Sequence, residues 1–331
     1  MSTQKSRNLW LDLFRFVLVF LVINIHFNQD SFFMPIFRMA VPMFFMISGY
    51  FAYSPAEEEQ NKKNARLIKG SLRYLIIACI IYFVFDMISI AIAASTGKVE
   101  TFMQSLFLMG GGTSTVICVS YGHHLWFLLS LLIVNCIHYL ICKKSLTKIY
   151  KYLIPVLIIL ALFLNGYIKL LGVEVPLMIT RNSIFTGLPM FAIGFLAKKH
   201  SLTIHSTWIK ASILFLSVFT LCLSLLEAQI VVMEYYICSV ISSFGFLLFF
   251  TSLQTKENKF SAWYYNYIGK NSTFNIYVYH VFIGIILKYF NLNLSPLLNC
   301  LIIFILSFAL HIAVHLTTKA FKEKKSKKQP S

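Results

Sequence analysis

The chain has 331 residues, of which 58% are hydrophobic and only 12% are charged, and its formal net charge at pH 7 is +17. This composition excludes an ordinary soluble domain and indicates an integral membrane protein with several transmembrane segments. The positive charge does not favour nucleic-acid binding, because the basic residues lie in short segments between apolar runs. We expect the lipid bilayer, and no nucleic acid, to be a partner of the protein.

The first apolar run follows Lys5 and Arg7, as in a secretory signal, but it has neither the short apolar core nor the small-residue cleavage site of a signal. We therefore expect a retained transmembrane helix. The seven cysteines are scattered, mostly through apolar runs, without the spacing of metal ligands. They predict no disulfide framework, and we expect no bound metal.

Helix positions follow from hydropathy, because a bilayer core about 30 Å thick requires about 20 apolar residues per crossing. This length predicts an all-α, polytopic membrane helical bundle of about ten transmembrane helices. The expected helices cover residues 9–28, 35–53, 72–94, 124–142, 152–168, 183–197, 207–226, 235–253, 268–288 and 297–317, and the sixth is short.

The connections between these helices differ in basic charge. If both termini lie on one side, the opposite side carries only Arg38, Lys98, Lys169, Arg181 and Lys288, and nearly all other Lys and Arg residues lie with the termini. Since basic loops stay in the cytoplasm, both termini are predicted to be cytoplasmic. We expect residues 1–318 to form the membrane-embedded domain and residues 319–331 a basic cytoplasmic tail.

The longest connection on the predicted outer side covers residues 95–123 and contains "GGGTST" and "YGHH". Irregular backbone at membrane depth is tolerated where it is buried in protein or lines an aqueous cavity, so a surface or re-entrant segment is predicted there. No internal repeat is visible, which weighs against transporters built from inverted repeats.

The first expected helix, "LWLDLFRFVLVFLVINIHF", carries Asp12, Arg15 and His26. Arg15 and His26 are 11 positions apart, so on a helix they lie within about 20° of the same face and about 16 Å apart along the axis. Asp12 precedes Arg15 by one turn, a spacing at which opposite charges can pair. One helix face is thus predicted to carry an ion pair and, farther along, an imidazole.

Charges inside a membrane are costly, at about 2.5 to 3.5 kcal/mol for an Arg or Asp at a helix centre on insertion scales. Such residues commonly face the bundle interior and serve function. The alternative is that Arg15 and His26 extend to opposite membrane surfaces. Their shared face favours function, because extension to the surfaces requires no alignment. Asp86 in the third expected helix is interpreted as a buried hydrogen-bonding group or, alternatively, a functional one.

Other polar residues have a structural and a functional interpretation. Arg38 precedes a helix with Ser48 and Gly49, small residues that favour close helix packing. Arg181 opens "RNSIFTGLPMFAIGF", whose glycines and proline are expected to break the helix. Arg181 either caps the outer interface or, on a side with few other positive charges, holds an anionic or sugar ligand.

Histidines lie near aromatic residues at two positions. His124, beside His123, and Trp126 stand at the start of the fourth helix, where a Trp is expected at the membrane interface. His280 lies between tyrosines in "NIYVYHVFIG" and is interpreted as a buried neutral imidazole bonded to a Tyr, or as a site residue. His311 and His315, four residues apart, have no acidic or Cys partner nearby, so a zinc site is not expected.

These segments together resemble the bacterial membrane acyltransferases of the acyltransferase-3 type, which O-acylate cell-surface glycans. The matching parts occur in the expected order along nearly the whole chain and are "LDLFRFVLVFLVINIH", "VPMFFMISGYF", "HLWFLLSLL", "TGLPMFAIGF" and "IGKNSTFNIYVYH". In size and layout the chain is similar to the stand-alone members of the family, such as those acting on enterobacterial common antigen.

The resemblance implies transfer of an acyl group, usually acetyl, from cytoplasmic acyl-CoA to a hydroxyl of a surface or lipid-linked polysaccharide, in the inner membrane of a bacterium. It implies His26 as the catalytic residue and Arg15 as a support for the donor site. Acetyl-CoA or another acyl-CoA is then a co-substrate, with no bound cofactor. The expected supporting or substrate-binding residues are Asp12, Arg38, Ser48, His124, Trp126, Arg181 and His280.

The chemistry fits an imidazole, which is the usual side chain for removing a hydroxyl proton near neutral pH. His26 either deprotonates the acceptor or carries the acyl group itself. Two other functions remain open. Buried Arg, Asp and His residues are also typical of a transporter or flippase of a polysaccharide precursor, and a catalytically idle membrane scaffold is the third possibility.

Overall fold

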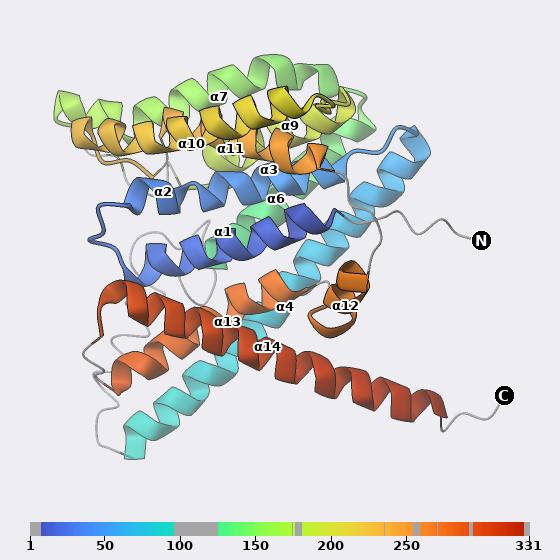
Figure 1. The fold of residues 1–331 in the computed structure, drawn as a ribbon, viewed down its shortest axis with the longest axis vertical. Coiled ribbons are helices and arrows are strands. Elements are labelled where there is room, and N and C mark those ends of the chain that lie inside the picture. The colour runs from blue at the N-terminus through green and yellow to red at the C-terminus, as the bar shows by residue number, and fades with distance from the viewer. Residues whose placement is uncertain are drawn as a thin grey trace. The chain divides into compact units, whose positions relative to one another are not determined.

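The computed structural model describes residues 8–95, 125–173, 175, 181–234, 236–253, 259–269, 271–290 and 294–327. Within these residues all regular elements are helices (Figure 1). The chain divides into two compact units. The first unit is Met1–Ala40 with Phe249–Ser331, and the second unit is Val41–Leu248.

The first unit joins the two ends of the sequence. Its helices are α1 (Leu9–Phe27), α2 (Met34–Arg38), α12 (Lys259–Tyr267), α13 (Ser272–Tyr289) and α14 (Pro296–Lys327). Helix α1 begins where the Asn8 side chain accepts a hydrogen bond from the backbone N–H of Leu11 at 3.1 Å, which satisfies one of the open amides of the first turn. It packs against α2, α13 and α14; Figure 1 shows α1 in blue beside α13 and α14 in orange and red.

The contacts of α1 are mostly aromatic. Phe16 meets the rings of Tyr264 and Phe308 edge-on, with centroid distances of 6.2 and 5.8 Å, an arrangement that aromatic pairs prefer. Near the end of α1, a Cβ atom on Gly284 of α13 would come within 2.0 Å of the Phe27 ring. The glycine therefore allows α13 to approach α1 closely, next to His26.

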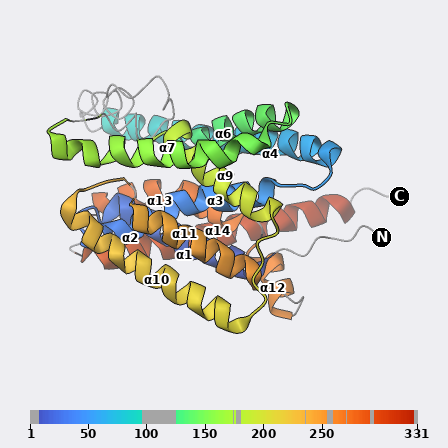
Figure 2. The same ribbon diagram turned by 90° about the horizontal axis from the view of Figure 1, so that it is seen from above.

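The second unit contains the remaining helices. They are α3 (Ala40–Ala52), α4 (Glu57–Ser95), α6 (Trp126–Lys143), η2 (Thr147–Ile149), α7 (Tyr150–Asn165), η3 (Tyr167–Leu171), η4 (Ser183–Gly187), α9 (Leu188–Lys199), α10 (Thr207–Ile230) and α11 (Ile237–Ser252). Helix α4 packs along α6, and α7 packs along α9, as Figure 2 shows for α4 and α6. Element η4 is a π-helix that leads directly into α9.

Two glycines bring the backbones of α3 and α9 together. A Cβ atom on Gly49 would lie 1.8 Å from the carbonyl oxygen of Phe191, and one on Gly194 would lie 1.8 Å from that of Met46. Neither distance is possible for a real side chain, so both positions require glycine. The predicted close packing at Gly49 is confirmed. The predicted helix break falls before Leu188, at the change from π- to α-helix, and α9 continues through Gly194.

A helix lies at each of the ten positions predicted from hydropathy, with differences in length. Seven helices of the described residues are long and apolar enough to cross a membrane, and Ile237–Ser252 and Ser272–Lys288 are shorter apolar helices. The sixth predicted helix corresponds to η4 and α9. A polytopic membrane protein is therefore supported, whereas the number of crossings and the side of the termini remain predictions.

Two helices are longer than hydropathy predicted, and one short helix was not predicted. Helix α4 begins at Glu57 rather than at residue 72, because its first turns are polar and stabilised by local pairs such as Lys62 with Glu58. Helix α14 continues to Lys327, so part of the predicted tail is helical. The short α12 was not predicted at all, since its mixed polar and aromatic composition resembles a loop.

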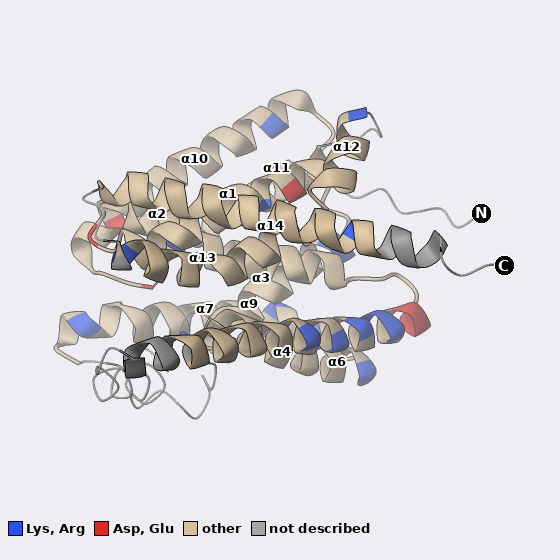
Figure 3. Ribbon diagram, turned by 90° about the horizontal axis from the view of Figure 1, so that it is seen from below, with Lys and Arg blue, Asp and Glu red and all other residues tan. Residues whose placement is uncertain are grey.

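Basic residues concentrate in the N-terminal half of α4 (Figure 3), where the sequence has Lys62, Lys63, Arg66, Lys69 and Arg73. At the same end of the second unit, Lys199 donates to Thr147 at 2.9 Å and Lys198 donates to Tyr50 at 3.3 Å. This gathering agrees with the loop-charge pattern of the sequence. The predicted re-entrant segment of residues 95–123 lies almost wholly outside the described residues, as does the side chain of Asp86.

Candidate functional site

The ion pair predicted in the first helix is present. Nη1 of Arg15 donates to Oδ1 of Asp12 at 2.6 Å, across one turn of α1. The Asp12 residue is 7% exposed and the Arg15 side chain 19%, so both charges are largely withdrawn from solvent. Pairing offsets much of the cost of burying them.

Tyr265 completes this pair and was missed by sequence reasoning. Its hydroxyl donates to the second carboxylate oxygen of Asp12 at 3.0 Å. Helix α12 presents Tyr265 because the neighbouring Tyr264, 2% exposed, packs with Leu9 and Ile268. The only signal in the sequence is the aromatic run "WYYNY", which by itself does not indicate a contact with a helix about 250 residues earlier.

At the other end of α1, His26 lies beside His280 of α13. Their ring centroids are 5.4 Å apart with an interplanar angle of 42°, and His280 is fully buried. Nδ1 of His280 lies 2.6 Å from the carbonyl oxygen of Tyr277. Because a carbonyl only accepts, Nδ1 carries the proton, and in the neutral imidazole Nε2 then has the lone pair. The expected hydrogen bond between His280 and a Tyr is therefore made by the backbone carbonyl of Tyr277, not by a tyrosine side chain.

Helix α1 is continuous from Leu9 to Phe27, so the ion pair and His26 keep the axial separation of about 16 Å expected from helix geometry. Arg38 is the last residue of α2, which packs against α1. The first unit thus contains His26, Arg15, Asp12, Arg38 and His280 of the predicted residues.

The second unit contains three other predicted residues. The Ser48 hydroxyl donates to the carbonyl oxygen of Phe44 within α3 at 2.8 Å. Trp126 begins α6, and the Arg181 guanidinium carbon lies 5.9 Å from the centroid of its ring. His124 lies outside the described residues.

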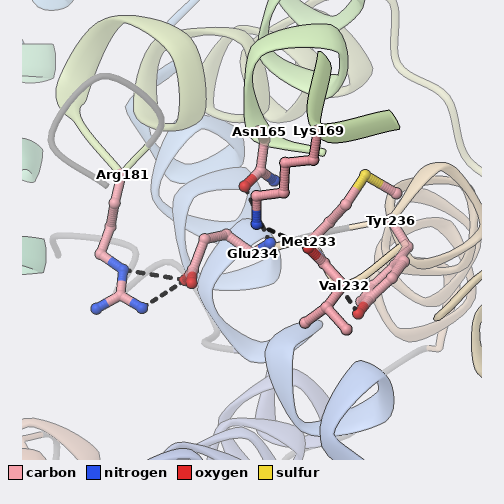
Figure 4. A network of polar contacts seen from close by, with 7 residues as sticks. All are labelled: Asn165, Lys169, Arg181, Val232, Met233, Glu234 and Tyr236. Carbon is pink, nitrogen blue, oxygen red and sulfur yellow. Dashed lines mark hydrogen bonds and ion pairs between the residues drawn. The ribbon is translucent and has the colours of Figure 1, made fainter. Parts of the chain in front are cut away.

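Arg181 has a charged partner that sequence reasoning did not identify. Its Nε donates to Oε2 of Glu234 at 3.0 Å, and its Nη2 donates to the same oxygen (Figure 4). The pairing with Glu234 weighs against the alternative in which Arg181 holds an anion; the interface cap and the sugar ligand stay as predictions.

His138 is a second buried histidine that the sequence did not single out. Nδ1 of His138 lies 2.8 Å from the hydroxyl of Tyr150, and its ring contacts Phe191 and Phe195 at centroid distances of 5.0 and 4.6 Å. These contacts hold α6, α7 and α9 together. In α14, His311 uses both ring nitrogens, with Asn275 at 2.9 Å and the Ile268 carbonyl at 2.6 Å. Within the described part of the chain, His138 and His311 thus have packing roles.

Comparison with known proteins finds one family. The acyltransferase-3 family model, described as an acyltransferase domain, matches residues 8–316. No curated protein and no solved structure matches the chain significantly. The matched region includes all of the predicted site residues.

Proposed function

Because the chain belongs to the acyltransferase-3 family of membrane acyltransferases, we propose that it transfers an acetyl group from cytoplasmic acetyl-CoA to a hydroxyl of a cell-surface or lipid-linked glycan. The observation that carries the proposal is the arrangement along α1, where a largely buried Arg15–Asp12 pair lies in one half of the helix and His26, beside His280 of α13, lies in the other. Similarity to the acetyltransferases of enterobacterial common antigen, and location in a bacterial inner membrane, form part of the proposal.

His26 is the proposed catalytic residue. In the direct route its imidazole takes the proton of the acceptor hydroxyl, the oxygen attacks the thioester carbonyl, and the carbon–sulfur bond breaks. The proton then passes to the departing thiolate, so that the products are the O-acetyl ester and free CoA. In the two-step route an imidazole nitrogen first accepts the acetyl group and releases CoA, after which the acceptor takes it up. The arrangement suits either route.

His280 is proposed to position His26. Its own ring is held by the Tyr277 carbonyl, and it lies beside the His26 ring. Close contact with a neutral, oriented imidazole restricts the rotation of His26 without adding a charge. A fixed orientation raises the rate because the base must meet the hydroxyl proton in one geometry.

Arg15 is proposed to support the acyl donor. Acyl-CoA is strongly anionic, and a cation at the predicted cytoplasmic half of α1 attracts it. Asp12 and Tyr265 hold the guanidinium in place. The lysines of α4 serve positive-inside topology and add to the attraction.

Surface glycans of cells with and without the gene test the proposal by mass spectrometry. Loss of one acetyl mass per modified sugar in the deletion strain, with the polymer retained, supports acyl transfer. Loss of the whole polymer instead supports the alternative function as a flippase or transporter of a precursor.

Replacement of Arg15 by alanine should raise the KM for acetyl-CoA more than tenfold and affect kcat less. The physical reason is the loss of a buried charge-assisted interaction, for which about 1.5 to 3 kcal/mol is typical. Steady-state kinetics of the purified protein in liposomes measure both constants. An unchanged dependence on acetyl-CoA would contradict the donor role of Arg15.

Replacement of Tyr265 by phenylalanine should raise the KM for acetyl-CoA several-fold and leave kcat within about twofold, because only the hydrogen bond that orients Asp12 is lost. Tyr267→Phe is the matched control, since Tyr267 lies on the same helix and is 46% exposed. Equal effects of the two substitutions would show that Tyr265 does not position the pair.

A further inference from the structure

The connector between α10 and α11, residues 231–236, is the meeting point of several polar side chains of the second unit. Arg181, just before η4, pairs with Glu234 of the connector. Asn165 at the end of α7 accepts a hydrogen bond from the Glu234 backbone N–H at 3.1 Å. Lys169 in η3 donates to the carbonyl oxygen of Val232 at 3.1 Å. Figure 4 shows these side chains converging on the connector from two directions.

Two buried polar atoms of the second unit, one beside this connector and one two residues after Arg181 in the sequence, have no hydrogen-bond partner among the described residues. They are Nδ2 of Asn165 and Oγ of Ser183, the first residue of η4. Both residues are only 3% exposed. A buried polar group that lacks a partner costs about 1 to 3 kcal/mol, and such groups in a folded protein call for an explanation such as a functional role.

The charges of the connector balance. Lys169 and Arg181 are cations, and Glu227 and Glu234 are anions, so these four side chains sum to zero. Glu227 accepts hydrogen bonds from the backbone N–H groups of Ile237 and Cys238 at 2.9 and 3.1 Å, which fixes it at the start of α11. A phosphate or carboxylate ligand would meet the Glu234 carboxylate beside Arg181 and be repelled. The balance therefore favours a neutral ligand.

The described residues of the connector, 231–234 and 236, are held in place by a hydrogen bond and by packing. The Met233 N–H donates to the Tyr236 hydroxyl at 3.2 Å, and a Cβ atom on Gly166 would lie within 2.1 Å of the Met233 sulfur. Val231, Met233 and Tyr236 form one buried cluster. A polar set held in this way loses little conformational entropy when it binds a ligand.

We propose that Arg181, Glu234 and Asn165 form a binding subsite for a neutral, hydroxyl-rich sugar of the acceptor glycan. Glu234 accepts from sugar hydroxyls, and Arg181 donates to them. Asn165 holds the Glu234 backbone in position. The Arg181 and Glu234 side chains are 31% and 17% exposed, so they remain accessible to a ligand. The Trp126 ring packs beside the Arg181 guanidinium. The inference rests on the proposed function. The distribution of basic residues among the loops predicts that this end of the second unit faces the outer side of the membrane.

Kinetics of the full-length protein in liposomes test the subsite. The donor is radiolabelled acetyl-CoA, and the acceptor is a total glycan and glycolipid extract of cells that lack the gene. Glu234→Gln keeps the shape of the side chain but removes its charge, and Arg181→Lys keeps the charge but loses the planar fork. Both should raise the KM for the extract about tenfold and leave the KM for acetyl-CoA within about twofold. The label should elute with neutral sugars on anion exchange.

Glu58→Gln is the matched control, because it breaks an exposed ion pair with Lys62 in the same unit and should raise neither KM. Unchanged acceptor KM in both site variants overturns the subsite, as do equal increases in both KM values, which indicate a structural role. Label confined to anionic sugars overturns the neutrality of the ligand. A parental protein that transfers no label to the extract overturns the proposed function itself.

Discussion

Replacement of His26 by alanine is expected to lower acetyl transfer at least about a thousandfold, the upper range of what a positioned general base contributes. The loss is large because no neighbouring group on the same face of α1 can take over the proton. His280 is adjacent, but its ring is fully buried, so the lone pair on its Nε2 is not exposed to an acceptor hydroxyl. Transfer from labelled acetyl-CoA to the glycan extract measures the effect.

His315→Ala is the control for the loss of a histidine. His315 lies in the same unit, and its ring nitrogen Nε2 is 3.2 Å from the carbonyl oxygen of Asn266 in an exposed contact. Its replacement should leave transfer near the parental rate. Both variants should reach the membrane in equal amounts, because His26 is half-buried at the end of its helix. Parental activity in His26→Ala would rule out His26 as the catalytic residue.

Labelling experiments on His26 distinguish the direct route from the two-step route. If His26 carries the acetyl group, incubation with labelled acetyl-CoA in the absence of acceptor releases about one equivalent of CoA and labels the protein. If His26 acts only as a base, the thioester stays intact until the acceptor is added. Parental protein and His26→Ala, compared in this way, identify the route.

Replacement of Gly49 by alanine is expected to prevent stable folding. The added Cβ would stand 1.8 Å from the carbonyl oxygen of Phe191, about half of a normal contact distance, and a backbone atom cannot rotate away. Helices α3 and α9 would have to separate along their contact, which costs at least the roughly 3 kcal/mol at the top of the usual range for overpacking. Gly194→Ala should act in the same way from the other helix, since its Cβ meets the carbonyl oxygen of Met46.

Gly70→Ala provides the matched control. Gly70 lies within α4, and a Cβ atom there has no neighbour within 4 Å, so alanine should stabilise the helix by up to about 1 kcal/mol through its higher helix propensity. Membrane abundance and the melting temperature of the purified protein measure both changes. Equal melting temperatures for Gly49→Ala and Gly70→Ala would contradict the close crossing of α3 and α9.

Hydropathy located the helices because burial in lipid requires long apolar runs, and each of the ten predicted positions holds a helix. The differences arise where helices are stabilised by something other than apolar length. The first half of α4 depends on side-chain pairs such as Lys62 with Glu58, and α12 depends on packing of Tyr264 against α1 and Ile268. Neither interaction leaves a hydropathy signal.

The candidate site, like the fold, was predictable from the sequence only in part. The Asp12–Arg15 pair follows from a spacing of one helical turn, so the sequence alone predicted it. The partners of these and other residues come from distant segments. Tyr265 reaches Asp12, His280 lies beside His26, and Glu234 neutralises Arg181 only because helices far apart in the sequence pack together.

The sequence by itself determined a membrane bundle, the place of its helices and the charged face of α1, because helical periodicity and apolar length are local properties. Its ordered motifs also resemble an acyltransferase family, and the family model confirms that membership. Only the tertiary structure decided which groups surround each charge. It showed that Arg181 pairs with Glu234, and that His26 has a second imidazole beside it. Contacts between helices depend on how side chains from distant segments fit together, and one amino-acid sequence by itself does not show that fit.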